Sequence, residues 1–206
     1  MNELYRNVSG TFFIKVLGLG ITFIFQVILG RTLEPEFYGQ YTMFLTYTNV
    51  LSIIAVLGMD RNLIKEVARI TDDKFQCGNL LSFSIKVSLF IFVLLSLLII
   101  IFHNSLSISL NAIHFLLMML LINVIIVIFD GFLQGIGFIV RVTFLNTLIN
   151  NILKIVFFIT LIYVGVKGLN AALYSFIIGE IITIALRSVT IKKFLGNHIR
   201  LKSHLS

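Results

Sequence analysis

The sequence predicts an all-α membrane protein, a bundle of about six transmembrane helices with both termini in the cytoplasm. Of its 206 residues, 58% are hydrophobic and only 12% are charged, whereas about a quarter of the residues in a soluble domain carry a charge. The mean hydropathy is +1.05. We therefore expect the chain to reside in a lipid bilayer rather than in water.

Six stretches are long and apolar enough to cross the bilayer as helices. The hydrocarbon core is about 30 Å thick, so a spanning helix needs roughly 20 mainly apolar residues. The first run follows Arg6, as in a signal peptide, but it is too long and no small-residue cleavage site follows it. The predicted spans lie near residues 8–29, 39–57, 79–102, 111–129, 143–165 and 169–188.

The basic residues predict the orientation of these spans. With six spans both termini lie on one side, and eleven of the sixteen Lys and Arg residues fall on that side. Only Arg31 and Lys167 fall on the other side, and Lys15, Lys86 and Lys154 fall within spans. By the positive-inside rule both termini are cytoplasmic. Topology thus accounts for the net charge of +7, and no nucleic-acid partner is expected.

The chain is predicted to form one six-helix transmembrane lobe over residues 1–190. Residues 191–206 are expected to be a basic cytoplasmic tail or the stub of a linker. Cys77 is the one cysteine, and the four histidines lack the spacing of metal ligands. No nucleophile and base are recognisable as a set, so we expect no metal, no cofactor and no catalytic residue.

A short polar segment interrupts the apolar sequence after the first span. It reads GRTLEPEFYGQ, and it contains Pro35, the single proline of the chain. Because proline cannot continue a helix, residues 30–39 are predicted to form the external turn between the first two spans.

Several segments at the ends of spans are together similar to a known family. Arg6 and Asn7 precede the first span, residues 30–39 contain the pattern LxPxxYG, and the second span ends in GMDR at 58–61. The fourth span ends in DGFLQG at 130–135. In these features the chain resembles the bacterial polysaccharide flippases of the multidrug, oligosaccharidyl-lipid and polysaccharide exporter superfamily. Only the LxPxxYG turn is at all specific.

The resemblance implies a function in transport. Members of the family typically carry twelve or more spans in two six-helix lobes around a central cavity, and this chain corresponds to the amino-terminal lobe. It is therefore expected to flip an anionic lipid-linked oligosaccharide across the bacterial cytoplasmic membrane for cell-surface polysaccharide biosynthesis. Membrane lipid and a second lobe or second copy are the expected partners. The alternatives are an ion-coupled small-molecule exporter of the same superfamily, or a non-transporting truncated or scaffold protein.

Ionisable residues within spans are candidates for contact with the substrate, because a charge in the bilayer is costly. Lys15 and Lys86 lie about seven residues inside the cytoplasmic ends of their spans, roughly 10 Å deep at 1.5 Å per residue. Either they extend to the lipid headgroups, or they line the cytoplasmic mouth of a cavity that accepts an anionic headgroup.

Lys154 and Glu180 flank the turn near residues 165–168 at similar distances, so both are expected near the midplane. Either they form an ion pair between the last two spans, or Lys154 contacts a phosphate while Glu180 tunes its charge or accepts a coupling proton. Asn146 and Asn150 precede Lys154 at four-residue spacing on one helical face. They join helices by hydrogen bonds, or they form a polar cavity wall.

The segment from Asp60 to Lys74 is predicted to be an amphipathic helix at the membrane surface, with Asp60 as its N-cap. It is expected to anchor the chain to anionic lipid or to capture a diphosphate headgroup. Its apolar face carries Leu63, Val67 and Ile70, and its basic face carries Arg61, Lys65 and Arg69.

Small and amide side chains within the apolar sequence are assigned to packing. Gly131 and Gly135 have the small-xxx-small spacing that lets membrane helices approach closely. Gln26 and Asn123 stand alone in the first and fourth spans, where we expect them to contact neighbouring helices.

Overall fold

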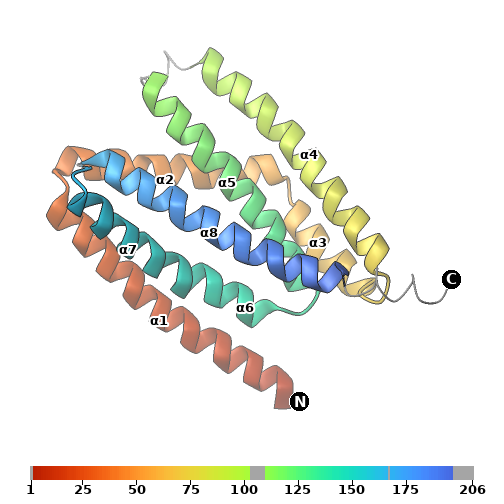
Figure 1. The fold of residues 1–206 in the computed structure, drawn as a ribbon. Helices are drawn as coiled ribbons and strands as arrows, with labels where there is room; N and C mark the ends of the chain where they lie inside the picture. The colour runs from red at the N-terminus through yellow and green to blue at the C-terminus, as the bar shows by residue number, and fades with distance from the viewer. Residues whose placement is uncertain (1, 103–109, 167, 197–206) are drawn as a thin grey trace. The chain divides into compact units, whose positions relative to one another are not determined.

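The structure, a computed structural model, describes residues 2–102, 110–166 and 168–196, and within these ranges it is helical with short turns (Figure 1). Lys167 and residues 197–206 of the predicted tail lie outside the described residues. The elements are α1 (Asn2–Thr32), α2 (Pro35–Val56), α3 (Met59–Arg69), α4 (Lys74–Ile101), α5 (Leu110–Gly135), α6 (Ile139–Phe144), the π-helical segment η1 (Leu145–Ile149), α7 (Asn150–Tyr163) and α8 (Leu169–Gly196).

The helices confirm an all-α membrane bundle. Five stretches of the described chain are long and apolar enough to cross a bilayer, and α2 and α3 reach that standard only together, with a bend of 51° between them. The second predicted span, near residues 39–57, is thus part of a bent pair. The five are Gly10–Thr32, Lys74–Ile101, Ile113–Gly135, Ile139–Tyr163 and Leu169–Gly196.

The chain folds into two compact units. The first consists of the chain up to Val50 together with Ile139–Thr183, and the second of Leu51–Phe138 together with the chain from Ile184 onward. Helices α2 and α8 each contribute residues to both units.

In the first unit, α1 packs along α6, η1 and α7 (Figure 1). Gly18 allows the close approach, because a Cβ atom at this position would lie 2.5 Å from Cβ of Thr147. Phe25 meets Phe158 edge to face at 6.1 Å between ring centroids. This seam buries apolar side chains of α1 against the helix that carries Lys154.

The external turn is shorter than the sequence predicted. Helix α1 continues through Gly30 to Thr32, and α2 begins at Pro35, so only two residues lie between the helices. Proline suits this first helical position because the amide there has no partner within the helix. The hydroxyl of Tyr38 donates to Oε1 of Gln26 at 3.0 Å, which holds α2 against α1 and confirms the packing assignment of Gln26.

In the second unit, α5 packs against both α3 and α4 (Figure 1). The glycines of α5 face α3 at very short range. A Cβ atom at Gly131 would lie 2.7 Å from the carbonyl oxygen of Asp60, and one at Gly135 would lie 2.9 Å from Cβ of Val67. The predicted close helix packing at these glycines is confirmed. Asn123 on the same helix donates to Oγ of Ser52 at 3.4 Å.

The start of α3 differs from the prediction. The N-cap is Gly58, which has a φ of 74°, and no side chain caps the helix there. Asp60 is the second residue of the helix, so its assignment as the N-cap is wrong. Its carboxylate still lies near the helix start, where the macrodipole favours negative charge. Gly58 takes the cap because only a residue tolerant of the left-handed region allows the sharp bend after α2.

We expect Gly131→Ala to destabilise the fold, because its Cβ atom would collide with the backbone of α3 and overpacking typically costs about 1–3 kcal/mol. Gly20→Ala is the matched control, since nothing lies within 4 Å of a Cβ atom there and alanine favours the helix. Thermal unfolding of the two purified variants in detergent checks this. Equal melting temperatures would contradict the close packing of α3 and α5.

Candidate functional site

A buried polar cluster in the first unit centres on Glu180 of α8. Lys154 Nζ donates to Glu180 Oε1 at 2.8 Å, and both side chains are only 9% exposed. Asn150 Nδ2 donates to the same oxygen at 2.8 Å. Thr183 Oγ1 lies 3.4 Å from the second carboxylate oxygen. We call Asn150, Lys154, Glu180 and Thr183 the Glu180 cluster.

Local sequence on α7 and α8 brings this cluster together. Asn150 and Lys154 are four residues apart and so lie on one face of α7. Gly179 lets α8 approach that face, because a Cβ atom there would lie 3.2 Å from Cγ of Lys154. The ammonium group of Lys154 also lies 4.0 Å from the ring centroid of Phe176, where a cation is attracted to the aromatic face. The predicted ion pair between the last two spans is therefore present.

Asn146 lies one turn before Asn150, in η1, and its side chain is partly exposed. The helix is wound more widely here, since the amide of Asn150 donates to the carbonyl of Leu145, five residues earlier. Single π-helical turns of this kind occur often at functional sites. The proposed part of Asn146 in a polar cavity wall stays a prediction.

The two other lysines predicted within spans have exposed side chains. Lys15 lies on α1 in the first unit, and Lys86 lies on α4 in the second. Both of their predicted roles, contact with headgroups and lining of a cavity mouth, require an exposed ammonium group. Both roles stay predictions, whereas Lys154 is distinguished by its burial.

The amphipathic helix predicted from Asp60 to Lys74 is present as α3 but is shorter, because α3 ends at Arg69 and Lys74 begins α4. Ile70, which was predicted for the apolar face, follows the helix as its C-cap. Leu63 and Val67 are buried on one face, against α5. Arg69 pairs with Glu66 at 3.4 Å, with the arginine side chain 68% exposed. The contact of this exposed basic face, which carries Arg61, Lys65 and Arg69, with a lipid or a diphosphate headgroup stays a prediction.

A second buried ion pair, in the second unit, was missed from the sequence. Arg187 Nε donates to Asp130 Oδ1 at 2.7 Å, and the arginine side chain is 0% exposed. Arg187 is one of the eleven basic residues assigned to the cytoplasmic side, because it lies at the very end of the last predicted span, 169–188. In the structure Arg187 is instead buried within α8, which continues to Gly196. The absence of any helix-breaking residue between Arg187 and Gly196 was the available signal.

We expect Asp130→Ala to destabilise the protein far more than Glu66→Ala. Removing Asp130 leaves a fully buried guanidinium without its carboxylate, which typically costs about 3–5 kcal/mol. Glu66 belongs to an exposed ion pair of the kind that contributes about 0–1 kcal/mol. Unfolding of both variants in detergent measures the difference. Similar losses of unfolding free energy in the two variants would show that the Asp130–Arg187 pair is accessible to solvent.

Comparison with known proteins agrees with the resemblance seen in the sequence. A family model described as polysaccharide biosynthesis protein matches residues 4–205. No curated protein and no solved structure matches the chain. The match covers almost the whole sequence, so it includes both buried ion pairs and the external turn. With its apolar helices, the chain is a multi-pass membrane protein that belongs to the polysaccharide biosynthesis protein family.

Proposed function

We propose that the chain helps to translocate an anionic lipid-linked oligosaccharide across the bacterial cytoplasmic membrane, and that the Glu180 cluster receives a phosphate of this substrate. The family match supports a role in polysaccharide biosynthesis or export. The observation that carries the finer proposal is a buried intramembrane cation, Lys154, whose counter-ion is a titratable carboxylate. Ionisable groups at such positions mark substrate and ion pathways in membrane proteins.

The donors of the Glu180 cluster converge on a single acceptor atom. Lys154 and Asn150 both donate to Glu180 Oε1, each at 2.8 Å. A phosphate oxygen presents the same charge and the same acceptor geometry, and charge-assisted hydrogen bonds of this kind are strong. Exchange of the carboxylate for a phosphate would keep both donors satisfied.

The displaced carboxylate would couple movement of the substrate to movement of a proton. A buried carboxylate without a cation favours its protonated form, because burial penalises the charge. Uptake of one proton by Glu180 would thus accompany capture of the phosphate by Lys154, and its release would accompany return of the ion pair. Substrate movement would then be linked to proton movement without any covalent step, so we propose a carrier and not an enzyme.

A further acceptor in the cluster is unused in the described part of the chain. Asn150 Oδ1 is buried and makes no hydrogen bond there. Such groups usually indicate a water molecule or a ligand. A hydroxyl group of a saccharide is a donor of suitable chemistry for this amide oxygen.

The proposal includes a second six-helix bundle, in another chain or a second copy. Carriers of this architecture work by the movement of one bundle against another around a site near the midplane. The resemblance to the two-lobe flippases supports this arrangement.

An ion-coupled exporter of small cationic compounds is the second candidate. Asp130 favours it, because this buried carboxylate adds a second acid to the described spans. Each of the two acids already has a buried cation as its partner, Lys154 or Arg187. Lys15 and Lys86 are two further basic residues within the predicted spans, so the excess of positive charge still favours an anionic substrate.

Exchange of the two charged residues separates a structural role of the pair from a role in transport. The variant K154E/E180K keeps an ion pair at the same place but moves the cation to α8. We expect its melting temperature to stay within a few degrees of the native value. Translocation of a labelled lipid-linked oligosaccharide in proteoliposomes should fall at least about tenfold, because a contact to phosphate is worth roughly 1.5–3 kcal/mol.

Two further variants control for this exchange. Lys154→Arg retains the cation on α7 and should keep most of the transport, whereas K154Q/E180Q removes both charges and should lose it. Near-native transport by K154E/E180K would show that the pair only fastens α7 to α8, and the phosphate assignment would be abandoned.

A further inference from the structure

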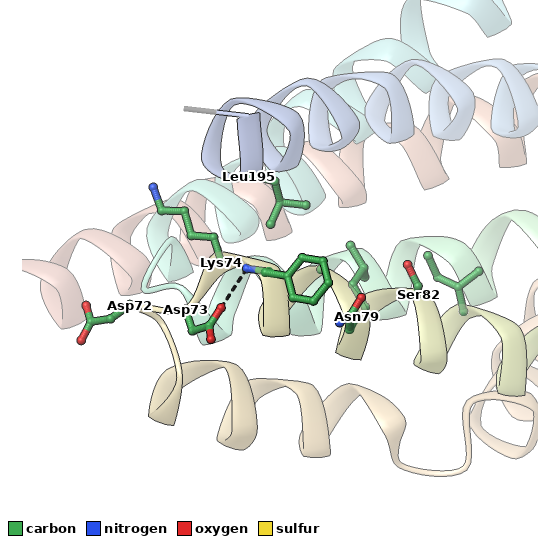
Figure 2. A pocket seen from close by; sticks show the side chains of 10 residues that line it. Asp72, Asp73, Lys74, Asn79, Ser82 and Leu195 are labelled. Atoms are coloured by element: carbon green, nitrogen blue, oxygen red, sulfur yellow. Dashed lines mark hydrogen bonds between the residues drawn. The ribbon is translucent and has the colours of Figure 1, made fainter. Parts of the chain in front are cut away.

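A cavity of about 900 Å³ lies in the second unit, where α4 begins and α8 ends (Figure 2). The positive-inside rule predicts this end of α4 to face the cytoplasm. Its volume is in the range of cavities that hold small ligands. No residue of the Glu180 cluster lines it.

The lining of the cavity changes from charged to mainly apolar along α4, with two polar side chains, Asn79 and Ser82, among the apolar ones. Asp72, Asp73 and Lys74 lie at its beginning. Leu81 and Ile85 lie farther into the predicted span, and Leu195 of α8 also lines the cavity (Figure 2). Eleven residues separate Lys74 from Ile85, which is roughly 16 Å along a helix. A ligand that fits must therefore have a charged end and an apolar body.

Two of the charged groups are held in place by the fold. The side chain of Lys74 extends toward α8, and its Nζ lies 5.0 Å from the ring centroid of Phe194 (Figure 2). Asp73 Oδ1 accepts hydrogen bonds from the backbone amides of Phe75 and Gln76, each at 3.1 Å. The charged end of the cavity thus offers both a fixed cation and a fixed carboxylate.

We propose that this cavity binds one zwitterionic aminophospholipid. The primary ammonium group of the headgroup contacts Asp72 and Asp73, the phosphate contacts Lys74, and an acyl chain lies along Leu81 and Ile85. This lipid site is separate from the proposed transport site and does not depend on the proposed function.

The charges exclude other common lipids from this site. Two carboxylates repel the headgroup of an anionic lipid, which has no positive charge to set against them. A lipid-linked diphosphate is excluded for the same reason. A choline headgroup is cationic but has no N–H group, so it cannot donate the hydrogen bonds that the carboxylates accept.

The surrounding residues suit a lipid rather than a soluble ligand. Phe75 lies at the level of the charged groups and is 76% exposed. Aromatic side chains are favoured in the interfacial region of the bilayer, beside the headgroups. Helix α4 itself is apolar enough to span the bilayer, so the apolar end of the cavity lies at the depth of acyl chains.

Gly78 provides a way to fill the cavity without disturbing the helix. A Cβ atom at Gly78 would lie 3.9 Å from Leu195 Cδ2, an ordinary contact. Gly78→Ala should therefore leave the site open, whereas Gly78→Phe should occupy it. Gly20→Phe is the matched control, because it adds the same ring to α1 where nothing lies within 4 Å.

The test is native mass spectrometry of the purified full chain after exchange into an equimolar mixture of phosphatidylethanolamine, phosphatidylcholine and phosphatidylglycerol. We expect the native chain to retain one phosphatidylethanolamine at least about tenfold over either competitor. Gly78→Phe should abolish this preference, and Gly78→Ala and Gly20→Phe should keep it. The variant D72N/D73N should also lose it, while its folding is preserved because asparagine retains the helix cap.

Three results would overturn the assignment. Preferential retention of phosphatidylglycerol would show that the cavity, or the nearby basic face of α3, selects negative charge. Equal retention of all three lipids, or a phosphatidylethanolamine preference that survives Gly78→Phe, would show that the bound lipid lies elsewhere.

Discussion

Buried charge on α8 is the constraint on which each compact unit depends. In the first unit Glu180 is compensated by Lys154 of α7, and in the second Arg187 is compensated by Asp130 of α5. A buried ion left without its partner typically costs about 3–5 kcal/mol, a large part of the stability of a protein. A shift of α8 by one residue would rotate these side chains by about 100°. The pairs therefore fix the register of α8 within each unit.

Glycine adjoins both buried acids. Gly131 follows Asp130 and faces the backbone of α3, and Gly179 precedes Glu180 and faces the side chain of Lys154. Without a side chain at these positions the helices come close enough to exclude water from the neighbouring pair. Exclusion of water strengthens the attraction between the charges and makes loss of either partner more costly. Close packing and charge pairing are thus consequences of the same local sequence.

Hydropathy and residue counting predicted the features that are determined by a single continuous segment of the sequence. The spans and the amphipathic α3 follow from composition and period, and the depths of Lys154 and Glu180 follow from their distances to one turn. Asp130 and Arg187 are 57 positions apart. They do not flank a common turn, so counting residues from a turn could not predict that they lie at the same depth in the membrane. Hydropathy also ended the last predicted span at residue 188, just after Arg187, although a paired charge is tolerated within a spanning helix.

The ion pair that stabilises α7 against α8 would compete with the phosphate of the proposed substrate. Because Lys154 and Asn150 are both engaged by one oxygen of Glu180, a substrate phosphate gains these donors only when the carboxylate leaves them. The observed affinity for phosphate would therefore depend on the difference between the binding free energies of the two anions at this site. The free energy needed to separate the ion pair would lower that affinity. In the proposed carrier, the carboxylate of Glu180 would return to the two donors and displace the phosphate, which would favour release of the substrate.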